Sequence, residues 1–185
     1  AVKANPSPDL LTILWESGIT HYDVASIAEV RLVARTLPQA TLCFMHPVKA
    51  EEAIAEAYHD HGVRTFSLDT MEELEKIERA TGGATDLTLC VRLRVSSEHS
   101  KLSLAAKFGA EPQEVRQLLI ATRQLADALG ICFHVGSQAM SPAAYSEAMQ
   151  RVRAAIVDAA VTVDVVDVGG GFPSSYPGME PPPLE

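Results

Sequence analysis

The sequence predicts an α/β fold of the barrel type, in which parallel strands alternate with helices around a common axis. Seven strand-like apolar runs recur without any reversal of pattern, near residues 1–4, 20–24, 41–45, 64–68, 87–95, 130–135 and 162–168. Runs as apolar as 41–45, each followed by a helical segment, are typical of parallel strands covered by helices. We therefore expect a (β/α)8 barrel that stops about one strand before closure. A doubly wound sheet is the structural alternative.

Helix boundary signals lie between these runs. Helix starts are indicated by Pro8 after Ser7 and by two capping boxes, Ser26 to Glu29 and Thr70 to Glu73. Helix stops are indicated by Gly62, Gly82 and Gly130. Each signal falls between two apolar runs, as an alternating fold requires.

Composition limits the class of protein. A chain of 185 residues, 47% hydrophobic, is enough for one buried domain, and we treat 1–185 as that domain. No apolar run reaches about 18 residues, so no membrane span is expected. The net charge of −9 argues against a nucleic-acid surface and is compatible with a cationic substrate. The chain opens inside an expected strand and ends in a proline-rich segment, so we expect the domain to be incomplete at both ends.

The cysteines and histidines do not predict a metal centre. Cys43, Cys90 and Cys132 each lie in an apolar run, which favours buried thiols and a reducing, cytoplasmic compartment. The histidines other than His134 lack ligand spacing on a common face.

Polar residues and glycines recur where the expected strands end. They are Lys3, Asp23, Arg92, His134 and the run Gly169, Gly170 and Gly171. Strand C-termini of such a barrel share one rim, where active sites lie, so we expect these residues to form one site.

Lys3 and the glycine run together suggest the cofactor. A partly desolvated lysine amine at the barrel mouth is the nucleophile that a Schiff base with an aldehyde needs. Consecutive glycines let backbone N–H groups approach a phosphate, and barrel phosphate sites commonly follow strands seven and eight. The pair therefore predicts pyridoxal 5'-phosphate (PLP). Taken singly, Lys3 fits a surface lysine better than a nucleophile, and the glycine run fits a plain tight turn as well as a phosphate site.

The other rim residues allow two readings each. His134 fits either a ring stacked on the cofactor or a core histidine. Arg92 and Arg94 face the same way by strand periodicity, and either could bind a carboxylate. Asp23 could orient the lysine or the ring, or simply precede the next helix. Ser137 could bind the phosphate or cap a helix.

Five segments together resemble the alanine-racemase-fold (fold type III) PLP-dependent decarboxylases. They are Ala1-Val2-Lys3-Ala4-Asn5, Asp23-Val24-Ala25-Ser26 with Glu29, Lys107-Phe108-Gly109, His134-Val135-Gly136-Ser137 and Asp167-Val168-Gly169-Gly170-Gly171-Phe172-Pro173. The phenylalanine and proline after the glycines, with His46-Pro47-Val48-Lys49, are more similar to ornithine and lysine decarboxylases of the eukaryotic-like type than to diaminopimelate decarboxylases.

The resemblance implies roles for single residues. Lys3 would bind the cofactor, His134 would stack on its ring, and Ser137 with Gly170 and Gly171 would bind its phosphate. Arg92 is preferred over Arg94 because it lies fifteen residues before Lys107, at the family's spacing. The family's eighth strand, with its acidic partner for the ring nitrogen, and its C-terminal β domain have no counterpart here.

The resemblance also implies an activity. We expect a carboxy-lyase that converts L-ornithine, or next L-lysine, to a diamine in polyamine biosynthesis, and a homodimer with shared active sites. Three alternatives stay open: a diaminopimelate or other fold type III decarboxylase, an amino-acid racemase or small cofactor-homeostasis protein on the same barrel, and a noncatalytic regulatory homologue.

Overall fold

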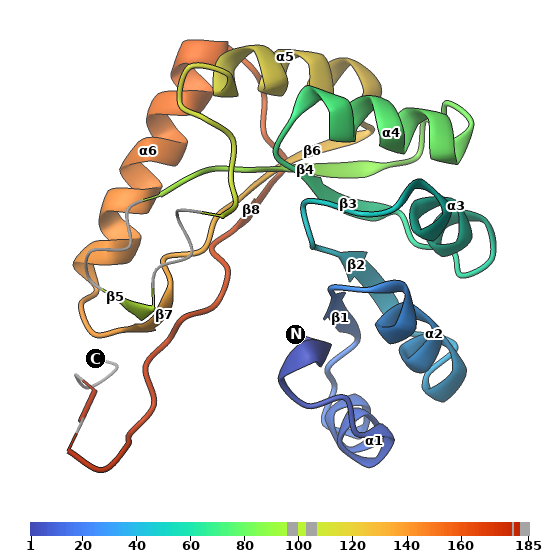
Figure 1. Cartoon of the computed structure of the whole chain (residues 1–185), viewed down its shortest axis with the longest axis vertical. Coiled ribbons are helices and arrows are strands. Elements are labelled where there is room, and N and C mark those ends of the chain that lie inside the picture. Colours follow the sequence, from blue (N-terminus) through green and yellow to red (C-terminus); the bar gives the residue numbers. More distant parts are fainter. Residues whose placement is uncertain (96–99, 103–106, 179, 182–185) are drawn as a thin grey trace.

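A six-stranded parallel sheet forms the centre of the protein (Figure 1). The computed structural model describes residues 1–95, 100–102, 107–178 and 180–181. The strands are β1 (His21–Val24), β2 (Thr41–Phe44), β3 (Thr65–Leu68), β4 (Thr88–Arg92), β6 (Ala128–Cys132) and β8 (Val165–Asp167). They lie side by side in chain order, whereas a doubly wound sheet turns back at a switch point. The predicted open barrel is therefore confirmed and the doubly wound alternative is excluded.

Helices cover the outside of this sheet. They are α1 (Pro8–Glu16), α2 (Ile27–Thr36), α3 (Glu51–His59), α4 (Met71–Thr81), α5 (Val115–Leu125) and α6 (Ala143–Ala159). Successive helices pack against one another, and Figure 1 shows α2 to α6 following an arc around the strands. The core between the two layers is apolar and includes Phe66, Leu89 and Ile131, which are almost inaccessible to solvent.

The expected first strand is wrong. Residues Val2–Ala4 form a single turn of 3-10 helix, η1, in which the Asn5 N–H donates to the Val2 carbonyl at 3.0 Å. Val2 is buried and anchors the turn, which explains the apolar pattern that was interpreted as a strand. A further pair of short antiparallel strands, β5 (Ser100–Leu102) and β7 (Ser137–Ala139), lies apart from the parallel sheet.

Gly130 is also not a helix stop, because it lies inside β6, directly opposite Cys90 of β4. A Cβ at position 130 would stand 2.4 Å from Cys90 Sγ, so a glycine lets the two strands pack here. Gly82, by contrast, ends α4 with a φ of 70°, as expected of a C-terminal glycine. Gly62 follows the end of α3 with a φ of 68°.

The two capping boxes cap their helices but use their glutamates differently. Ser26 Oγ accepts from the Glu29 N–H at 3.3 Å, and Glu29 Oε2 accepts from the Ala25 N–H at 2.9 Å. Thr70 Oγ1 likewise accepts from the Glu73 N–H at 3.2 Å. The Glu73 carboxylate, however, contacts the loop after β2 instead of the start of its own helix.

The three cysteines are free thiols. Cys90 and Cys132 are buried as predicted, whereas Cys43 is half-buried. Burial raises the pKa of the Cys90 thiol to about 12, which keeps it protonated and unreactive at neutral pH. Among the described residues no cluster of metal-ligating side chains occurs, and none of the helices there is long and apolar enough to cross a membrane.

Candidate active site

A cavity of about 460 Å³ opens where the parallel strands end. Its lining residues come from segments far apart in the chain and are Ala1, Lys3, Asp23, Ala25, Met45, His46, Arg92, Phe108, Cys132, Phe133, His134, Asp167, Gly169 and Gly170. The structure thus brings together six of the eight predicted site residues. Ser137 and Gly171 do not line the cavity itself.

His134 lies two residues beyond β6, so the strand is shorter than predicted. Its Nδ1 accepts a hydrogen bond from the Gly136 N–H at 3.0 Å. Partial burial and the nearby charges of Arg92 and Lys3 lower the pKa of the imidazole. At neutral pH the ring is therefore uncharged and carries its proton on Nε2. An uncharged imidazole of this kind can stack on the flat ring of a ligand.

The turn after β8 requires glycine at two positions. Gly169 and Gly171 have φ values of 67° and 97°. A Cβ on Gly169 would lie 2.3 Å from the Phe133 carbonyl oxygen, and one on Gly171 would lie 2.1 Å from that of Gly136. The turn can therefore pack against the loop that carries His134 only if positions 169 and 171 have no side chain.

This turn leaves backbone donors available for an anion. The Gly169 N–H donates to Asp167 Oδ1 at 2.8 Å. Within the described part of the chain, no group accepts a hydrogen bond from the Gly170 or Gly171 amide. Two adjacent donors beside a neutral imidazole and a lysine fit the phosphate and ring of a pyridoxal cofactor.

Tyr145, which the sequence analysis missed, holds the same turn from α6. Its hydroxyl donates to the Gly170 carbonyl at 3.1 Å, and its ring stacks on Phe172 at 5.0 Å between centroids. Nothing in the sequence marked this tyrosine, because it lies in the first turn of a helix and its hydrogen-bond partner is 25 residues away.

Arg92, His46 and Phe108 form one side of the cavity, which we call the aromatic wall. Arg92 ends β4, and its guanidinium lies 5.1 Å from the centre of the Phe108 ring. Phe108 in turn meets the His46 ring edge-on at 5.3 Å. His46 and Phe108 were not predicted as site residues, although both lie in segments that carry the family resemblance.

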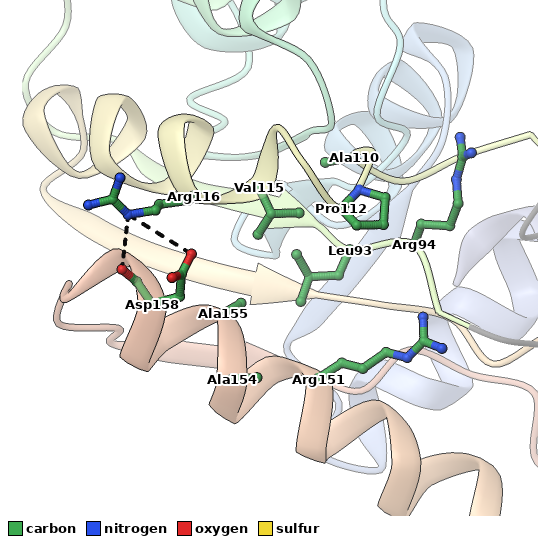
Figure 2. A pocket seen from close by; sticks show the side chains of 10 residues that line it. All are labelled: Leu93, Arg94, Ala110, Pro112, Val115, Arg116, Arg151, Ala154, Ala155 and Asp158. Atoms are coloured by element: carbon green, nitrogen blue, oxygen red, sulfur yellow. Dashed lines mark hydrogen bonds and ion pairs between the residues drawn. The ribbon is translucent and has the colours of Figure 1, made fainter.

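Arg94 lies outside this cavity. It lines a second cavity of about 400 Å³ between α5 and α6 (Figure 2). Its guanidinium pairs with Glu111. The opposite end of that cavity holds the Arg116 and Asp158 pair. Strand periodicity fails here because β4 ends at Arg92 and Leu93 bridges to Ala110. Only Arg92 of the two can therefore reach a ligand in the first cavity.

Lys3 and Asp23 lie on the η1 and β1 side of the cavity. Lys3 is exposed, so the predicted desolvation of its amine is not found. Burial raises the pKa of the Asp23 carboxyl, Asp167 raises it further, and positive charges that include Lys3 oppose the shift. The cavity is thus lined by the Lys3 amine, by the carboxylates of Asp23 and Asp167, and by the Arg92 guanidinium.

A family model described as the pyridoxal binding domain of pyridoxal-dependent decarboxylases matches residues 1–185. The chain belongs to this decarboxylase family. The lysine/ornithine decarboxylase of Selenomonas ruminantium is 37% identical over 178 residues, which cover 94% of this chain and 44% of that protein. Human antizyme inhibitor 2 is 31% identical over 180 residues, which cover 95% of this chain and 38% of that protein.

A solved structure agrees with the family assignment. The lysine decarboxylase from Selenomonas ruminantium superimposes with a TM-score of 0.80 at 35% identity, covering 94% of this chain and 46% of that one. The chain therefore spans less than half the length of these decarboxylase-family relatives and corresponds to their pyridoxal-binding barrel.

We expect His134→Ala to weaken PLP binding by the full-length protein by at least about fivefold, since an aromatic stack contributes roughly 1 kcal/mol. His134→Phe keeps a flat ring and should retain most of the affinity. Fluorescence titration of each variant with PLP measures the difference. Equal affinities in the two variants, at unchanged activity, would make His134 a core residue without a stacking role.

Proposed function

We propose that the full-length protein is a PLP-dependent decarboxylase of a basic L-amino acid, with L-ornithine as the preferred substrate and L-lysine next. The observation that carries the proposal is the shared cavity of the Lys3 amine, the neutral His134 ring and Gly170 of the glycine turn. The names of the relatives support the substrate class, because the first is a lysine/ornithine decarboxylase.

Each residue would contribute one physical task. Lys3 would hold the aldehyde carbon through its Nζ until the amino group of the substrate takes its place. The Gly170 and Gly171 amides, with the Ser137 hydroxyl, would bind the phosphate, and the His134 ring would lie against the pyridine face. Arg92 and Asp23 would orient charged groups of the ligands. When bound, PLP supplies an electron-withdrawing ring for the electron pair left by carbon dioxide.

An assay of the full-length protein with PLP tests this function. L-Ornithine, L-lysine, L-arginine and diaminopimelate are supplied separately, and released carbon dioxide and amine products are quantified. We expect the highest kcat/KM for ornithine, with putrescine as product, and a lower value for lysine, with cadaverine as product. Racemisation without carbon dioxide release would contradict a decarboxylase.

A noncatalytic regulator is the second candidate, because antizyme inhibitor 2 is 31% identical over 180 residues. The same assay separates the two functions, since a regulator should show neither PLP binding nor amine formation. The retention of Lys3, His134 and the glycine turn in one cavity favours the enzyme.

We further propose that the enzyme acts in polyamine biosynthesis in the cytoplasm, as a homodimer with shared active sites. The three free thiols are compatible with a reducing compartment. Sedimentation equilibrium of the full-length protein measures the oligomeric state.

A further inference from the structure

A buried ion pair lies behind the aromatic wall. Lys49, in the loop between β2 and α3, pairs with Glu73 of α4 at 2.9 Å, and their side chains are only 1% and 3% exposed. Removing two charges from water costs several kcal/mol per ion, so such a pair persists only when its other hydrogen-bonding positions are filled. Here they are filled.

The Lys49 ammonium uses all three of its donors. Besides Glu73 Oε1, its Nζ donates to the carbonyl oxygens of His46 at 2.9 Å and Ser67 at 2.6 Å. Burial lowers the pKa of this ammonium, and the Glu73 carboxylate opposes the shift. Lys49 therefore connects the loop after β2 to the end of β3 and to α4.

Glu73 completes the network. Its Oε1 also accepts from the Lys49 N–H at 3.1 Å, and its Oε2 pairs with Lys76 Nζ at 2.6 Å. Lys76 in turn donates to the Lys49 carbonyl at 2.8 Å. The backbone of Lys49 is thus held through both its N–H and its carbonyl, in addition to its side chain.

The network reaches the cavity through His46, whose carbonyl Lys49 binds and whose ring lines the cavity. His46 Nδ1 accepts from the Val48 N–H at 3.2 Å, which leaves Nε2 as the ring nitrogen that carries the proton. The turn that carries Phe108 is held similarly, because Asp69 Oδ2 accepts from the Gly109 N–H at 2.9 Å. Buried ionic side chains next to β3 therefore support both aromatic members of the wall.

We propose that Lys49 and Glu73 are positioning residues that fix His46, and through it Phe108 and Arg92, in the orientation needed by the ligands of the cavity. This inference rests on the proposed decarboxylase function and extends it to two residues that touch no ligand. The loop that carries His46 and Lys49 lies partly at the surface, where Val48 is exposed, so the buried ion pair is its link to the core.

The test compares three variants of the full-length protein with wild type. Lys49→Met replaces the ammonium with an uncharged side chain of similar length. Glu73→Gln keeps the shape of the carboxylate but removes its charge. Ile77→Ala is the matched control, because it creates a cavity in the core on the same helix, one turn away from Glu73. Thermal unfolding, PLP affinity, kcat and KM are measured for each, below the melting temperature of all.

We expect kcat/KM to fall by about 10- to 100-fold in Lys49→Met and Glu73→Gln, because a misplacement of about 1 Å at a site can cost that much. Ile77→Ala should lose stability and keep kcat/KM. If the three variants lose activity only in proportion to their stability, the ion pair is structural and the proposal is wrong. If Lys49→Met does not fold, Glu73→Gln alone against Ile77→Ala decides.

A second measurement is independent of the cofactor. Nitrogen-15 NMR of the apoprotein reports which ring nitrogen of His46 carries the proton, with the signal assigned from a His46→Gln variant. We expect the Nε2–H form in wild type and in Ile77→Ala, and a mixture in Lys49→Met. An unchanged tautomer in Lys49→Met overturns the positioning role, whereas a wild type that binds no PLP overturns only the proposed function.

Discussion

Lys3→Ala should abolish decarboxylation by the full-length protein, because Lys3 carries the side-chain amine among the described residues that line the cavity, and an aldehyde cofactor needs such an amine for a covalent bond. Lys3→Arg should be equally inactive: it retains the positive charge beside Asp23 but cannot form a covalent bond with an aldehyde at neutral pH. The pair of variants therefore separates a nucleophile from a simple cation.

The position of the covalent bond can be read directly. Borohydride reduction of the wild-type protein with PLP, followed by proteolysis and mass spectrometry, should place the pyridoxyl group on the peptide that contains Lys3. A label on the Lys107 peptide or elsewhere would remove Lys3 from its assigned role. Lys3→Arg provides the control, since its reduced sample should carry no label at this position.

Gly171→Ala should be far more damaging than Gly170→Ala, although the two positions are adjacent. An alanine at 171 would adopt a φ of 97° and place its Cβ 2.1 Å from the Gly136 carbonyl oxygen. An unfavourable φ of this kind costs about 1–3 kcal/mol by itself, and the clash with backbone adds to it. We expect Gly171→Ala to lower both the melting temperature and the PLP affinity, the latter by about 100-fold.

Gly170→Ala is the matched control. Its Cβ would approach only His134 Nε2, at 3.6 Å, an ordinary van der Waals contact at a position without a positive φ. We expect a change in PLP affinity of less than about tenfold, or 1.4 kcal/mol. Titration with PLP and thermal unfolding check both variants, and similar losses in the two would show that the close backbone approach is not what the site depends on.

The sequence predicts most strands and helices of the fold, because the signals for these elements are local. Apolar runs, Pro8 at the first turn of α1 and the serine and threonine caps act within a few residues, and these elements form as expected. η1 escaped prediction because one buried valine looks the same in a short turn as in a strand. Gly130 escaped for a different reason, since its role depends on Cys90, forty residues earlier.

The residues of the candidate site show the same difference between local and distant signals. Asp23, Arg92, His134 and the glycines could be found because strand ends share one rim. Lys3 was found by the same rule, although it lies in the turn η1 and not at the end of a strand. His46 lies two residues beyond β2, as His134 lies two residues beyond β6, so the same rule could have found it. Phe108 and Tyr145 contact rings and backbone atoms of distant segments, and no spacing rule connects them. The two arginines illustrate the limit: strand alternation treats Arg92 and Arg94 alike, and only the end of β4 separates them.

The lining of the cavity comes from both edges of the parallel sheet. Lys3 belongs to the β1 end, and the glycine turn follows β8, the strand at the other end of the described order. Neighbouring strands rotate relative to one another by roughly 20–25°, and these rotations add up across the sheet. The distance between the Lys3 amine and the backbone donors of the glycine turn therefore depends on the total rotation of the strands between them. A substitution at a buried residue of β4, such as Leu89, can therefore change that separation although the residue touches no ligand.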